Sequence, residues 1–162
     1  EYAGIRKAGS AALQALSLQN GVFHMEWFEL ADGRLAISEV AARPPGAQIS
    51  SLLGFTHDFD LYRAWARLMI HNEFEAPERR WAAGAIFVRA QGRGQRITGI
   101  RGLERAQKEM GELVIEANLP EAGQPRKEGY EGDGYVLIRH PETEVVRRAL
   151  GRLVELIQVE TS

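Results

Sequence analysis

The pair Asp32-Gly33 limits the fold of this chain most strongly, because it lies between two apolar-rich runs. An Asp-Gly pair in that setting predicts a short hairpin turn, since both residues tolerate the positive φ of a primed turn. A turn centred there gives cross-strand partners whose residue numbers sum to 65. Glu26 then lies directly opposite Glu39, and Phe28 lies opposite Ile37.

Each strand of the predicted hairpin carries one carboxylate, Glu26 or Glu39, on the face that we expect to be buried. Directly opposed side chains have Cβ atoms about 4.5–5.5 Å apart, and like charges at that separation are destabilising. A shared divalent cation is the best reason for such a placement. Magnesium takes oxygen ligands, typically one or two carboxylates together with nucleotide phosphates and water. The two glutamates are therefore our candidate metal ligands.

Arg43 follows Glu39 by four residues and falls on the same face of the strand by the period-2 alternation. A guanidinium there can stabilise charge that develops on a transferring phosphoryl group or an acyl phosphate. The alternative is an ordinary hairpin in which one glutamate is exposed and pairs with Arg43. His24 shares the proposed face, either as a supporting or nucleotide-contacting group or as a half-buried histidine bonded to the backbone.

The motif residues follow one another in a recognisable order, which is Glu26, Asp32-Gly33, Glu39, Arg43 and Pro44-Pro45-Gly46. This order resembles the metal-binding end of the ATP-grasp superfamily, whose ligases join a carboxylate to an amine at the expense of ATP. The family motif has a glutamate, a glycine-containing turn and a second glutamate within Glu-x-Asn-x-Arg, followed by a Pro/Gly-rich loop. Ala41 stands at the asparagine position, so the resemblance leaves open whether one or two metal ions bind.

The resemblance implies a fragment of a ligase that activates a carboxylate as an acyl phosphate and passes it to an amine. It implies ATP and Mg²⁺ (or Mn²⁺) as cofactors, bound by Glu26, Glu39 and Arg43, with Arg43 also catalytic. The loop Pro44–Ile49 is closer to amino-acid and dipeptide ligases than to biotin carboxylase. The family's lysines and glycine-rich flap would lie in a missing N-terminal part of the same protein, so we expect the 162 residues alone to be inactive. The alternative is a non-catalytic module that has this fold and uses its surface for contact with another protein or for self-association into a homodimer.

The predicted fold class is α+β, with the end of an ATP-grasp core over residues 1–76 and a β-rich lobe ending in a helix over 77–162. Asp58 and Asp60 precede an amphipathic helix and are expected to cap its first turn, with a metal role as the alternative. The boundary between residues 1–76 and 77–162 is placed in the charged, proline-containing segment 73–80. The glycine-rich run 129–134 is read as a connector, or alternatively as a loop over the substrate.

Composition excludes several other classes of protein. A net charge of −2 gives no electrostatic footprint for nucleic acid. No apolar run approaches 18 residues and no basic-apolar leader is present, so neither a membrane protein nor a secreted one is expected. The absence of cysteine excludes disulfides and zinc–thiolate sites and is compatible with the cytoplasm, which is the expected compartment.

Overall fold

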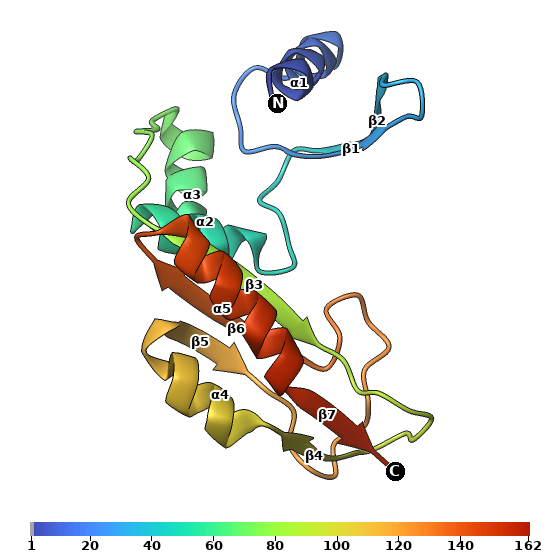
Figure 1. Ribbon diagram of the computed structural model, residues 1–162. Helices are drawn as coiled ribbons and strands as arrows, with labels where there is room; N and C mark the ends of the chain where they lie inside the picture. The colour runs from blue at the N-terminus through green and yellow to red at the C-terminus, as the bar shows by residue number, and fades with distance from the viewer. Residues whose placement is uncertain (1) are drawn as a thin grey trace. The chain divides into compact units, whose positions relative to one another are not determined.

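The computed structural model describes residues 2–162, which form five α-helices, one short 3-10 helix and seven strands (Figure 1). Every pairing between neighbouring strands is antiparallel, so the predicted α+β class is confirmed. The chain divides into two compact units. The first contains residues 2–46 and Asp60–Ala76, and the second contains Ala47–Phe59 and Pro77–Ser162. The chain thus passes between the units three times.

The first unit has four elements: α1 (Ala3–Ala15), β1 (His24–Glu29), β2 (Leu35–Ala41) and α3 (Leu61–His71). Helix α1 contacts β2, and a Cβ added at Gly9 would lie 3.6 Å from the sulfur of Met25 on β1. The helix ends at Ala15, because Ser17 adopts the left-handed conformation, with φ 56°, and its N–H donates to the Gln14 carbonyl.

The hairpin turn is one residue longer than the sequence predicts. The Leu30 N–H donates to the Arg34 carbonyl at 2.8 Å, and the Gly33 N–H donates to the Leu30 carbonyl at 2.8 Å. Gly33 takes the left-handed conformation, with φ 79°. Three residues therefore lie between the bonded pair Leu30 and Arg34, and the strand pairs next to the turn have numbers that sum to 64. Phe28 lies opposite Ala36, so its predicted pairing with Ile37 is wrong.

A β-bulge restores the predicted register farther from the turn. The register shifts between Glu26 and Trp27, because one extra residue of β2 is accommodated there. Beyond the bulge the sum returns to 65, and Glu26 lies opposite Glu39 as predicted. The two departures from the expected hairpin, a longer turn and a bulge, cancel each other at the carboxylates.

Helix α3 begins at the predicted place. The side chain of Asp60 accepts a hydrogen bond from the Arg63 N–H at 3.0 Å, which is a regular N-cap. The helix ends at Asn72, which takes the left-handed conformation, with φ 55°. The capping interpretation is thus confirmed for Asp60. Asp58 has a different role, described below.

The second unit is built around a three-stranded sheet of order β3-β6-β5, with a two-stranded sheet of β4 and β7 beside it. Its elements are α2 (Ile49–His57), β3 (Ala82–Val88), β4 (Ile97–Arg101), α4 (Leu103–Met110), the 3-10 helix η1 (Gly111–Leu113), β5 (Val114–Asn118), β6 (Gly134–His140), α5 (Thr143–Leu156) and β7 (Gln158–Thr161). The sequence predicts a β-rich lobe that ends in a helix, and it misses β7, a four-residue strand that follows that helix.

Helix α5 packs on β3 and β6 and closes the main hydrophobic core. Gly84 lets the helix approach the sheet, because a Cβ there would lie 2.5 Å from a methyl group of Leu150. Ile138 and Leu153 are fully buried in this core. The final helix therefore stabilises the second unit through its apolar face.

The segment between β5 and β6 is held in place by a buried carboxylate. Asp133 is only 3% exposed, and its two oxygens accept hydrogen bonds from the backbone N–H groups of Ala90 and Lys127, each at 2.7 Å. Arg89 donates to the carbonyls of Gly129 and Tyr130. These contacts favour the connector interpretation of the run 129–134.

Candidate metal and nucleotide site

The hairpin brings Glu26 and Glu39 to directly opposed positions on one face, with His24 and Ala41 as the next pair of partners on that face. Both glutamates are exposed, so the expectation that their face is buried is wrong. The physical reason is that α1 packs on the other face of the hairpin, where Met25 lies close to Gly9. The carboxylates are consequently open to an approaching ligand.

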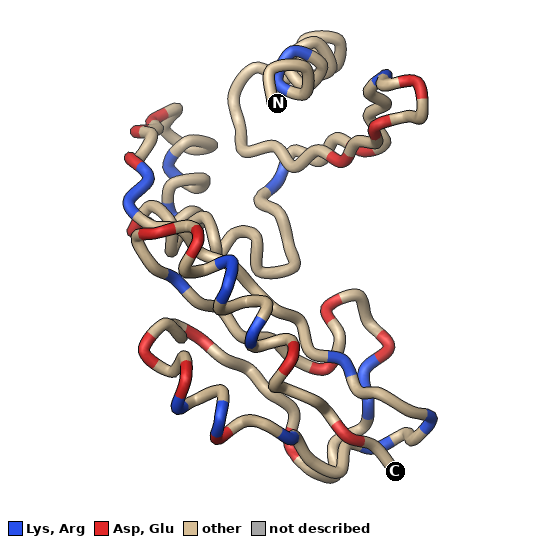
Figure 2. Tube along the Cα trace, viewed as in Figure 1, with Lys and Arg blue, Asp and Glu red and all other residues tan. Residues whose placement is uncertain are grey.

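The hairpin is strongly acidic for its size. Between His24 and Ala41 there are four carboxylates and one guanidinium, which gives a local charge of −3. Figure 2 shows these acidic positions along the hairpin. Arg34 pairs with Asp32 at 2.7 Å at the turn, and the hydrogen bonds from Arg34 lower the pKa of Asp32. No ion pair within residues 2–162 neutralises Glu26 or Glu39, so the opposed pair keeps its full attraction for a cation.

The donor set suits a hard cation that is only partly held by protein. Two opposed carboxylates offer oxygen ligands at a separation that one ion can bridge. Among the residues that the structure describes, no group of three or more His, Asp or Glu side chains is arranged to hold a metal ion. Glu26 and Glu39 would therefore share an ion with external oxygens, as magnesium does when it binds phosphates and water.

Arg43 lies just beyond β2, at the start of the loop that contains Pro44 and Pro45. Pro44 and Pro45 are buried, and Nη1 of Arg43 donates to the Pro44 carbonyl at 3.0 Å. In the described part of the chain, no ion pair links Arg43 to either glutamate. The alternative of an ordinary Glu–Arg pair on the hairpin is thus not what the structure contains, and the guanidinium keeps donors for a ligand.

His24 is half-buried, and its Nδ1 atom is buried without a hydrogen-bond partner within residues 2–162. The interpretation of a histidine bonded to the backbone is therefore wrong for this nitrogen. A buried polar atom without a partner is unfavourable, so an unpaired Nδ1 beside the carboxylates is a candidate contact for a ligand.

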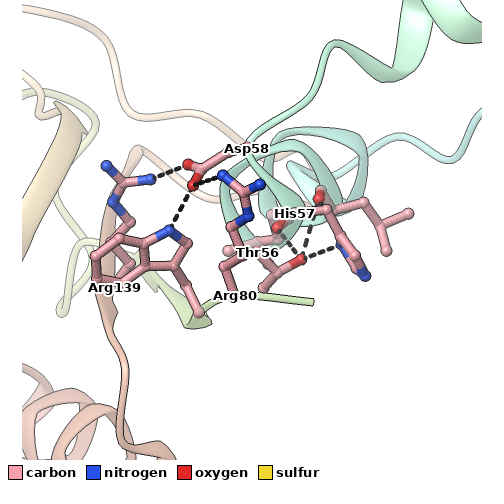
Figure 3. A network of polar contacts seen from close by, with 8 residues as sticks. Thr56, His57, Asp58, Arg80 and Arg139 are labelled. Carbon is pink, nitrogen blue, oxygen red and sulfur yellow. Dashed lines mark hydrogen bonds and ion pairs between the residues drawn. The ribbon is translucent and has the colours of Figure 1, made fainter. Parts of the chain in front are cut away.

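Asp58 belongs to a polar network that sequence reasoning missed. It ends α2 in the left-handed conformation, with φ 52°, and is not the N-cap of α3. Its carboxylate accepts from Trp81 Nε1 at 2.7 Å and from Arg139 Nη1 at 2.8 Å, while Arg80 lies 4.0 Å away (Figure 3). The partners lie 23 and 81 residues later, so no local pattern could have revealed them.

Comparison with solved structures shows which fold this is. An L-amino acid ligase from Bacillus licheniformis matches with a TM-score of 0.77 at 20% identity. An N5-carboxyaminoimidazole ribonucleotide synthetase from Thermotoga maritima matches at 0.66 and 16%, and a phosphoribosylglycinamide synthetase from Anaerococcus prevotii at 0.69 and 14%. Each match covers 98% of this chain and 42% of the other. No protein-family description and no curated protein sequence matches.

These solved structures are ATP-grasp carboxylate–amine ligases, so the chain has the fold of a portion of such a ligase. The resemblance inferred from the hairpin motif is confirmed at the level of the fold. The chain spans less than half the length of the proteins that it matches. Among the described residues, no helix is long and apolar enough to cross a membrane.

Proposed function

We propose that the chain is part of an ATP-dependent carboxylate–amine ligase, with Glu26 and Glu39 as ligands of a magnesium ion that is shared with ATP. The observation that carries this proposal is the direct opposition of two exposed, unpaired carboxylates on a hairpin within an ATP-grasp fold. Magnesium bound there would neutralise the β- and γ-phosphates of ATP. In this proposal residues 1–76 complete the ATP-binding core and 77–162 form a C-terminal lobe.

Arg43 has the catalytic role in the proposed reaction. A substrate carboxylate oxygen attacks the γ-phosphorus of ATP, ADP leaves, and an amine then displaces phosphate from the acyl phosphate. The guanidinium of Arg43 donates hydrogen bonds to the phosphoryl oxygens as their charge develops. The guanidinium of Arg43 is oriented by its hydrogen bond to the carbonyl of Pro44, which is buried and is followed by a second buried proline. His24 would contact the nucleotide or support a carboxylate through its unpaired nitrogen.

Exposed apolar side chains of the first unit support the further proposal that another part of the ligase packs against this unit. Its buried side chains are few, and large apolar groups of the hairpin and α3, such as Phe28 and Ile70, are exposed. A surface of this kind marks contact with another protein segment. The missing N-terminal part of a ligase is the proposed occupant, and self-association of a non-catalytic module is the alternative that the same surface favours.

Kinetics of the ligase that contains this chain test the role of Arg43. Arg43→Ala should lower kcat by roughly 10²–10³, because a donor that strengthens in the transition state is lost. The KM for ATP should change much less. Arg34→Ala is the matched control, since this arginine lies on the same hairpin and already pairs with Asp32. A raised KM with unchanged kcat would make Arg43 a binding residue only.

A further inference from the structure

Helix α2 directly follows the Arg43–Gly46 loop in the chain, yet it packs with the second unit. It contacts β3 and β6, an edge strand and the central strand of the three-stranded sheet in that unit. Two backbone hydrogen bonds tie its C-terminal end to the start of the strand region, because the Thr56 carbonyl accepts from the N–H groups of Arg80 and Trp81 at 2.9 and 3.1 Å. The C-terminal end of α2 is thus attached to the segment that leads into β3.

The side chain of Asp58 adds a second attachment at the same place. One carboxylate oxygen accepts from the indole N–H of Trp81, and the other accepts from Arg139, which lies on β6. The Arg139 guanidinium also lies over the Trp81 ring, with its Cζ atom 4.6 Å from the ring centroid. Asp58, Trp81 and Arg139 therefore form a closed triad in which each member contacts the other two, and we call it the α2 latch.

The local backbone is shaped for this contact. Asp58 takes the left-handed conformation that ends α2, and its N–H donates to the Gly54 carbonyl. Gly54 itself has no room for a side chain, because a Cβ there would lie 2.9 Å from the Phe59 carbonyl. The turn at the end of α2 therefore fixes the direction in which the Asp58 carboxylate points, as Figure 3 shows.

We propose that Asp58 is a positioning residue: the α2 latch holds the helix after the Arg43 loop on the C-terminal lobe, so that this helix moves with the lobe rather than with the hairpin. This inference rests on the proposed function only for its consequence in catalysis. The hydrogen bonds of the Asp58 carboxylate are to Trp81 and Arg139, so its effect acts through α2. The hydrogen bonds from Trp81 and Arg139 lower the pKa of Asp58, so the latch is closed at neutral pH.

Hydrogen exchange of the 162-residue chain tests the latch without requiring any activity. In Asp58→Asn, amides of α2 should exchange about tenfold faster, since a charge-assisted pair of hydrogen bonds is weakened. Amides of α5 should keep their rates. Asp60→Asn is the matched control, because asparagine caps a helix about as well as aspartate. Unchanged exchange in α2, or an equal increase in α5, would overturn the proposal.

A double-mutant cycle separates the triad from a general loss of stability. Trp81→Phe removes the indole N–H and keeps a ring beside Arg139, and it should speed exchange in α2 by less than Asp58→Asn does. Combined with Asp58→Asn it should add almost nothing further; additive effects would show that the two residues act separately. In an active ligase, Asp58→Asn should lower kcat/KM about tenfold. Faster exchange in α2 without this loss would refute only the catalytic consequence, and an inactive parent protein would refute only the proposed function.

Discussion

Replacing Asp133 by asparagine isolates one structural interaction of the second unit. Both carboxylate oxygens accept from backbone N–H groups at 2.7 Å, one from Ala90 and one from Lys127, and the side chain is buried. An asparagine has one acceptor oxygen, so its NH₂ group must face one of the two donors. A buried N–H then loses its partner, and the remaining hydrogen bond loses its charge.

The expected loss is about 2–3 kcal/mol, because a hydrogen bond to a charged group contributes roughly 1.5–3 kcal/mol and an unpaired buried donor adds a desolvation penalty. For a chain of this length that corresponds to a decrease of about 4–12 °C in the unfolding temperature. Thermal unfolding of Asp133→Asn beside the parent measures it. Glu128→Gln is the control, since it removes the same charge from an exposed position in the same segment. Equal unfolding temperatures for Asp133→Asn and the parent would refute the reasoning.

Two glycine substitutions test the packing of the second unit, and a pH series tests the ion pairs of Glu109 in the same unit. Gly102→Ala should destabilise by roughly 3 kcal/mol in urea unfolding, because Gly102 has φ 79° and the new Cβ would overlap the Leu156 carbonyl oxygen. Gly151→Ala, with open space around it inside α5, should instead stabilise by about 0.5–1 kcal/mol. Hydrogen bonds from Arg152 on α5, and to a lesser extent from Arg105 on α4, lower the pKa of Glu109 to about 2. The arginines stabilise only the ionised form of Glu109. The difference in unfolding free energy between the parent and Glu109→Gln should therefore be full above about pH 4.5 and disappear towards pH 2. A difference that stays constant with pH would show that the ionisation of Glu109 does not contribute to stability.

Local patterns were enough to predict the order of elements and the opposed glutamates, because turn residues and apolar periodicity act over short distances. The hairpin shows the limit of such reasoning. The longer turn at Gly33 and the bulge between Glu26 and Trp27 depend on how both strands fit together, and only their cancellation left Glu26 opposite Glu39. The sequence also assigned these glutamates to a buried face, since alternation identifies two faces without saying which one a helix covers.

Long-range contacts explain the other differences. The partners of Asp58 are Trp81, just before β3, and Arg139 on β6, so its role could not be read from its neighbours in the sequence. The final strand β7 is paired with β4, across more than fifty residues, and its four residues carry no signal of their own.

Manganese binding by the isolated chain tests the central claim most directly. Water-proton relaxation during a manganese titration should reveal weak binding, with a dissociation constant of about 1 mM, because two carboxylates supply only part of the coordination shell. Glu39→Gln should abolish it. Glu29→Gln, which removes the same charge from the other face of the same hairpin, should bind as the parent does. Equal responses from the parent and Glu39→Gln would contradict the assignment of Glu26 and Glu39 as the metal site.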